Sequence, residues 1–169
     1  MSGDEMTQET ERVHCPICGT EADMPVDTLT ALAEAPEVIG KAMREAPASE
    51  RGGWSPTEVV THLADTEVVT GWRLRQILAI DEPEIQPYDQ EKWAAALRYD
   101  TRDSGLSLEA FATARSANLE ILQLLSEEDW ERGYVQPEYG RQTLRTLIRH
   151  KSDHDLAHLR QIRGDLGAA

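Results

Sequence analysis

Residues 54–67 read WSPTEVVTHLADTE and combine a helix start with an apolar run. Ser55 is the expected N-cap, a proline occupies the first helical position, and Glu58 lies three residues after the cap, as in a capping box. Apolar residues continue at helical spacing to about Ile80. The stretch predicts a long amphipathic helix with His62 on the flank of its apolar stripe.

Other segments on both sides of this stretch also have helical spacing. The pattern predicts helices over residues 27–47, 107–126 and 143–164, and a short helix over residues 89–97. Pro36 marks a kink or an early break in the first of these helices. Residues 130–141 contain glycine and proline and are expected to form a loop, and no segment alternates with period two, so we expect no strands. Four main helices predict an all-α four-helix bundle.

Length and charge restrict the class of protein. The 169 residues suit one bundle domain over residues 26–169, preceded by a polar extension over residues 1–25. The formal net charge is -14, from 31 acidic and 17 basic side chains. Such a surface repels phosphate backbones, so we expect no nucleic-acid partner.

The sequence also argues against a membrane or secreted protein. No stretch approaches the ~20 apolar residues that a membrane span needs. The two cysteines, Cys15 and Cys18, lie too close together in the polar extension to cross-link a fold. We expect a soluble protein of a reducing, cytoplasmic compartment.

Three histidines form a candidate metal site. His154 and His158 are one helical turn apart and project from one face of the last helix, so a third histidine from another helix would complete a triad for a divalent metal. Helical projection places His158 at the edge of the apolar stripe, His154 a little further round on the same side, and His150 further still toward solvent. His62 borders the stripe of its own helix. The alternative is that these histidines are hydrogen-bonded packing residues.

Asp155 falls at the centre of the apolar stripe of the last helix. An unpaired carboxylate there would cost several kcal/mol, so Asp155 needs a partner. It could accept a hydrogen bond from His62 and orient that ligand, or it could bond to a loop backbone or an arginine.

The residues together resemble a known family. Residues 54–67 and the segment HDLAHLRQI at residues 154–162 resemble the two metal-bearing motifs of the DinB/YfiT-like superfamily, and the likeness extends over about residues 27–166. It implies a four-helix bundle, often dimeric, with a divalent metal, usually zinc or nickel. The ligands that it implies are His62, His154 and His158.

The resemblance leaves the reaction open, because similar proteins include transferases and isomerases that use low-molecular-weight thiols, hydrolases, and proteins with no known activity. Three neutral ligands leave coordination positions free, which is typical of catalytic zinc. Our first hypothesis is a transferase that acts on a small molecule through a metal-bound thiol, followed by a hydrolase that uses metal-bound water. The alternative is a non-catalytic metal-binding or stress-associated interaction protein, which a fourth protein ligand or a filled pocket would favour.

No catalytic residue is assigned from the sequence. Glu58 and Asp65 lie within one turn of His62, but both are better explained as helix-capping or surface residues than as a general base. Tyr88 and Asp89, with Trp93, could line a pocket or could serve packing and capping.

The extension contains the motif CPICG at residues 15–19. Cys15 and Cys18 could form half of a zinc knuckle, but a closed structural site needs four ligands. An unstructured tail with incidental cysteines is equally compatible with the sequence. A redox dithiol ranks third, because such a motif normally opens a helix of a thioredoxin-like unit.

Overall fold

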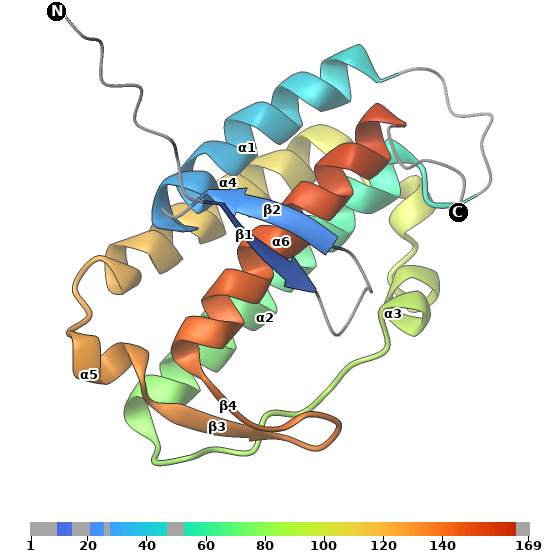
Figure 1. Cartoon of the computed structure of the whole chain (residues 1–169). Coiled ribbons are helices and arrows are strands. Elements are labelled where there is room, and N and C mark those ends of the chain that lie inside the picture. Colours follow the sequence, from blue (N-terminus) through green and yellow to red (C-terminus); the bar gives the residue numbers. More distant parts are fainter. Residues whose placement is uncertain (1–9, 15–20, 26–27, 47–52, 165–169) are drawn as a thin grey trace, which may run out of the picture.

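The computed structural model is a bundle of helices with two small β-hairpins (Figure 1). It describes residues 10–14, 21–25, 28–46 and 53–164. The helices are α1 (Thr28–Glu45), α2 (Pro56–Ala79), α3 (Gln90–Ala96), η1 (Tyr99–Thr101), α4 (Ser104–Leu122), α5 (Glu127–Trp130) and α6 (Leu144–Arg163). The strands are β1 (Thr10–His14), β2 (Glu21–Pro25), β3 (Gly133–Gln136) and β4 (Gly140–Thr143).

The four long helices form the bundle that the sequence predicts. Helix α1 packs against α4 and α6, and α2 packs against the same two helices. The order around the bundle is therefore α1, α4, α2, α6, so that α1 and α2 face each other across the centre. None of the described helices is long and apolar enough to cross a membrane.

The start of α2 confirms the predicted capping box. The Glu58 amide donates to Ser55 Oγ at 3.3 Å, and the Ser55 amide donates to Glu58 Oε2 at 2.8 Å. At the end of the chain, Thr143 caps α6 and Gly164 ends it with φ at 75°, a left-handed conformation that glycine adopts without strain. The helices that contain the candidate histidines thus begin and end where the local sequence directs.

The expectation of no strands is wrong. Strands β3 and β4 form an antiparallel hairpin. Most of its residues lie in the segment 130–141, which was expected to be a loop. Strands β1 and β2 form a second hairpin, and β2 contacts α1 and α6. These strands have four or five residues each, which is the lower limit of the length over which an alternating pattern can be recognised. Cys15 and Cys18 lie outside the described residues, so the predictions for the extension remain predictions.

Two helix boundaries also differ from expectation. Helix α4 begins at Ser104, three residues earlier than predicted, because Asp103 Oδ1 accepts a hydrogen bond from the Leu106 amide at 2.8 Å and caps the helix. It ends at Leu122 and not at Ser126 as predicted, because Ser126 is the N-cap of α5.

Pro36 does not break α1, which continues to Glu45. A proline cannot donate the N–H that would normally bond to the carbonyl four residues earlier, here that of Leu32. In this structure the Leu32 carbonyl accepts a hydrogen bond from Arg115 Nη1 at 2.7 Å. The carbonyl that Pro36 leaves without its helical donor is therefore still satisfied.

The core consists of two apolar clusters with a polar layer between them. The first cluster is built from Leu32, Leu74, Ile77, Ile85, Leu119, Leu122, Tyr134, Leu144, Leu147 and Ile148. The second is built from Ile39, Ala42, Val59, Val60, Leu63, Ala64, Phe111 and Ile162. Each long helix contributes to both clusters, so the polar residues between them occupy the middle of the bundle.

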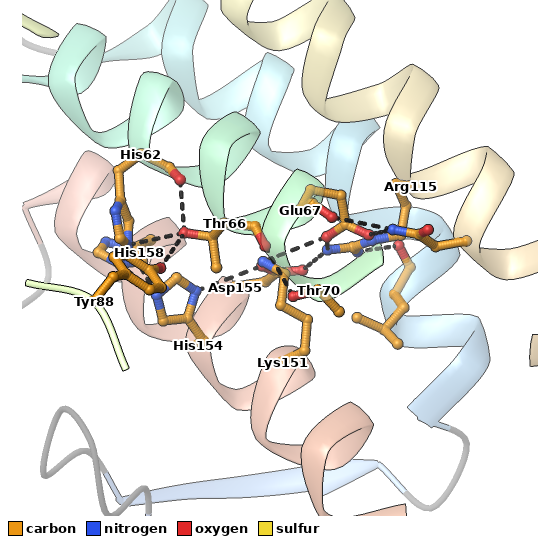
Figure 2. Close-up of polar contacts among 12 residues, drawn as sticks. His62, Thr66, Glu67, Thr70, Tyr88, Arg115, Lys151, His154, Asp155 and His158 are labelled. Atoms are coloured by element: carbon orange, nitrogen blue, oxygen red, sulfur yellow. Dashed lines mark hydrogen bonds and ion pairs between the residues drawn. The ribbon is translucent and has the colours of Figure 1, made fainter. Parts of the chain in front are cut away.

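The polar layer is a buried ion network centred on Arg115 of α4 (Figure 2). Its Nη2 donates to Glu67 Oε2 of α2 at 2.7 Å and to Asp155 Oδ2 of α6 at 2.6 Å, while its Nη1 bonds to the Leu32 carbonyl of α1. Lys151 Nζ donates to Asp155 Oδ1 at 2.6 Å. One guanidinium group thus joins all four long helices, and the two cations of the network balance its two carboxylates.

We expect Arg115→Met to lower the free energy of unfolding by about 3–5 kcal/mol, because it leaves two buried carboxylates with Lys151 as their one cation. Arg145→Met is the matched control, since Arg145 makes exposed ion pairs with Glu127 and Glu131 and should cost about 1 kcal/mol or less. Urea unfolding followed by circular dichroism measures both. Equal losses in the two variants would contradict the central role of the buried network.

Candidate metal centre

The structure brings His62 of α2 together with His154 and His158 of α6 (Figure 2). The Nε2 atom of His154 lies 3.0 Å from that of His62 and 3.2 Å from that of His158. One ring nitrogen of each residue lies within 4.8 Å of the other two. These are the three histidines that the sequence selected, and His150, on the same helix, lies outside the group.

Burial keeps these imidazoles neutral. Desolvation lowers the pKa of His154 to about 3, and it lowers the pKa of His62 and of His158 below the usual value for histidine. His158 Nδ1 lies 2.8 Å from Gln161 Oε1, which can only accept, so we assign the ring proton to Nδ1. His158 Nε2 then presents a lone pair to the other two rings, as a metal ligand must.

Hydrogen bonding among the three rings accounts poorly for their arrangement. A neutral imidazole has one N–H and one lone pair, yet His154 Nε2 is close to two other Nε2 atoms. His62 Nε2 also lies 3.3 Å from Thr66 Oγ1. Three imidazole nitrogens within 4.8 Å of one another instead fit a shared divalent cation, for which imidazole nitrogen is a preferred ligand. Among the described residues, no fourth histidine, cysteine or carboxylate joins the group.

Aromatic side chains lie beside the histidine group. The Trp54 ring, just before α2, meets the His62 ring edge-on with the centroids 5.0 Å apart. Thr66 Oγ1 lies 3.3 Å from the hydroxyl of Tyr88, whose ring packs on Trp93 at 4.6 Å. The loop before α3 therefore places a phenol hydroxyl beside the helix face that presents His62.

A cavity of about 290 Å³ adjoins the group. Its wall includes His154 and Lys151 of α6, Thr66 and Arg73 of α2, and Tyr88. The β3–β4 hairpin and the start of α3 complete the lining. The lining combines charged and hydroxyl side chains with apolar ones, and the cavity is large enough for a small molecule with one end at His154.

Asp155 has the arginine partner that was one of its three predicted alternatives. Its carboxylate bonds to Arg115 and Lys151, and it does not orient His62. Its Oδ1 lies 3.9 Å from His154 Nδ1, which is longer than a hydrogen bond. His154 Nδ1 is buried without a hydrogen-bond partner in the part of the chain that the structure describes.

The carboxylates near His62 in the sequence have structural partners. Glu58 completes the capping box, and Asp65 Oδ2 accepts a hydrogen bond from the Tyr99 hydroxyl at 2.6 Å. Asp89 caps α3, although it also lines the cavity. Tyr88 thus lies close to the histidine group, whereas the two candidate bases are occupied elsewhere.

Sequence reasoning missed Thr66, Arg73 and Lys151 as residues of the site. Thr66 follows His62 by one turn, and this spacing alone could have placed its hydroxyl beside the imidazole. Arg73 and Lys151 gave no such signal, because a cation on an amphipathic helix usually faces solvent.

Comparison with known proteins assigns the family. The model of the DinB superfamily matches residues 22–162. A relative from Bacillus licheniformis is 31% identical over 121 residues, which cover 69% of this chain and 68% of the relative. YfiT from Bacillus subtilis is 27% identical over 141 residues, which cover 80% of this chain and 78% of YfiT. Both relatives are named as proposed metal-dependent hydrolases.

The solved structure of YfiT has the same fold. It is described as a four-helix bundle of unusual topology, and it matches with a TM-score of 0.71 and 26% sequence identity over 84% of this chain and 87% of that chain. The family model covers most of the residues described above, including all three histidines of the group. The chain belongs to the DinB superfamily.

Proposed function

We propose that this protein is a metal-dependent enzyme that acts on a small molecule, with His62, His154 and His158 as the ligands of a divalent ion. The observation that carries the proposal is the convergence of three neutral imidazole nitrogens, one of them from His154, which lines the adjoining cavity. The names of the relatives support metal dependence. Zinc is the first candidate and nickel the second, because both accept imidazole ligands.

The protein residues have separate roles in this proposal. The three histidines would hold the ion, which would act as a Lewis acid and lower the pKa of a bound water or thiol. Thr66 Oγ1 donates to the His62 carbonyl at 2.7 Å, which fixes the hydroxyl beside the ring. The Tyr88 hydroxyl, 3.3 Å from Thr66, is positioned to hydrogen-bond to a molecule in the cavity. Trp54 covers the His62 ring on another side and limits access of water.

Two nucleophiles are compatible with such a centre. The names of the relatives favour water, and therefore hydrolysis, whereas the sequence resemblance favours a low-molecular-weight thiol and group transfer. A non-catalytic metal-binding protein is the alternative. The cavity beside His154, and the group of three ligands without a fourth among the described residues, support an enzyme over that alternative.

The first test is metal content. A variant with His62, His154 and His158 replaced by alanine should lose about one divalent ion per chain and keep its helicity, because an imidazole triad holds the ion in this proposal. His150→Ala is the matched control, since His150 also lines the cavity but lies outside the triad. Elemental analysis and circular dichroism give the two quantities. Equal metal in the wild-type and triple-variant proteins would refute the ligand assignment.

The second test identifies the nucleophile. Zinc-loaded protein should accelerate either hydrolysis of an activated ester or transfer of a small thiol to an aromatic halide, and the triple variant should show neither rate enhancement. Absorbance assays with and without added thiol follow both reactions. A rate that requires the thiol indicates a transferase, and a rate that does not require it indicates a hydrolase. Activity retained in the triple variant would argue against metal-dependent catalysis.

The third test is the pH dependence of stability of the metal-free protein. Burial lowers the pKa of His150 to about 4 and that of His154 to about 3, and it also lowers the pKa of His62 and His158. The unfolded chain takes up these protons near pH 6.5, so it binds more protons than the folded chain at lower pH. We expect stability to fall from about pH 6.5 to about pH 4, and this contribution to be fully present above about pH 7.

The triple variant is the control for this pH effect, because it retains His150 alone of these four imidazoles with a lowered pKa. Urea unfolding at several pH values should show a shallower pH dependence in the variant than in the wild-type protein. Equal slopes between about pH 4 and pH 6.5 would mean that the three histidines titrate alike in the folded and unfolded states.

A further inference from the structure

Arg73 places a cation in the wall of the cavity beside the histidine group. It lies on the same face of α2 as His62, Thr66 and Thr70, because these positions are separated by four, four and three residues. Thr66 and Thr70 line the cavity between the two ends of this row. The face of α2 thus runs from a candidate metal ligand at one end to a guanidinium group at the other.

No carboxylate neutralises Arg73 among the residues that the structure describes. Its Nη2 donates to the Gln86 carbonyl at 2.9 Å, and its guanidinium carbon lies 5.7 Å from the centre of the Tyr88 ring. Arg73 is half-buried, and burial lowers its pKa below the usual value for arginine, which reflects the cost of holding an unmatched cation there. The Arg73 guanidinium thus lies at the cavity wall with a backbone carbonyl and an aromatic ring as its neighbours.

The other charged residues of the cavity are matched or exposed. Lys151 is paired with Asp155 at 2.6 Å. Asp89 is exposed, caps α3 and pairs with Lys92 at 3.2 Å, and Glu138 is exposed. Arg73 is therefore the cation of the lining that keeps donors available for a ligand, since a guanidinium group has five N–H donors.

We propose that Arg73 binds a carboxylate group of the molecule that reacts at the histidine site. A planar guanidinium group matches a carboxylate through two parallel hydrogen bonds and fixes its orientation. Tyr88 connects the two ends of the cavity, because its ring faces Arg73 and its hydroxyl lies 3.3 Å from Thr66 Oγ1. The substrate class is thus a small carboxylic acid whose reactive end lies near His154, and this assignment rests on the function proposed above.

The test uses cobalt-loaded protein and two matched series of probes. Mercaptocarboxylates with two to six carbons are compared with the mercaptoalcohols of the same length, and binding of the sulfur is followed through the thiolate-to-cobalt absorption band. The carboxylate at the best length should bind the wild-type protein at least about tenfold more tightly than its alcohol. That length also reports the span between the metal and the guanidinium group.

Arg73→Gln should abolish this preference and leave both the metal content and the affinity for the alcohols unchanged. Arg75→Gln is the matched control on the same helix, because Arg75 bonds to the Gly71 carbonyl and to Asn118 and does not line the cavity. It should retain the preference for the carboxylate. Equal affinities for acid and alcohol in the wild-type protein, or a preference that survives in Arg73→Gln, would overturn the proposal while metal binding stands.

Failure of the metal site has a different signature. If no cobalt spectrum develops, the proposed function fails, and the carboxylate site is then measured on the metal-free protein. Addition of 3-mercaptopropionate should shift the side-chain ¹⁵N resonance of Arg73 and leave that of Arg75 in place. The absence of a shift at Arg73 would overturn the carboxylate assignment independently of the metal.

Discussion

The Arg115 guanidinium is the contact on which the arrangement of the bundle depends. Two apolar clusters alone would hold four helices together, but apolar packing tolerates rotation and sliding of one helix against another. Bonds from Arg115 to Glu67, Asp155 and the Leu32 carbonyl specify which face each helix turns inward. We regard this specificity as the main effect of the network, because buried ion pairs contribute little net stability compared with apolar residues of the same size.

The ion network and the histidine group occupy neighbouring positions on α2 and α6. The orientation of the helices that forms one of them therefore also determines the other. Glu67 follows His62 on α2, and Asp155 follows His154 directly on α6. When Asp155 points to Arg115, the ring of His154 is turned toward α2 and meets His62. The two carboxylates and two cations of the network add no net charge beside the site, so a divalent ion would meet three neutral ligands next to a balanced network.

Much of the fold and of the candidate site could be predicted from the sequence, because both depend on local signals. The capping box at Ser55 and the four-residue spacing of His154 and His158 are readable without tertiary information. The β3–β4 hairpin was missed because its pairing comes from a tight turn at Gly140 and a contact with the segment before α3. The ion network could be predicted only in part. The sequence showed that Asp155 requires a partner, but the choice of Arg115 depends on how helices distant in sequence pack. The position of Arg73 in the cavity wall could not be predicted, since it depends on how α2 packs against the loop before α3.

The Pro36 position in α1 has a consequence for how sequences of this fold can vary. The Leu32 carbonyl has no helical donor because residue 36 is a proline, and Arg115 of another helix supplies the donor. A residue with an N–H at position 36 would compete with Arg115 for that oxygen. If Arg115 were lost, the oxygen would lack a hydrogen-bond donor as long as residue 36 is a proline, but a residue with an N–H at position 36 could supply one. The two positions are therefore thermodynamically coupled, so that the effects of substituting them should not add. Neither position can drift freely during evolution without changing the selection that acts on the other.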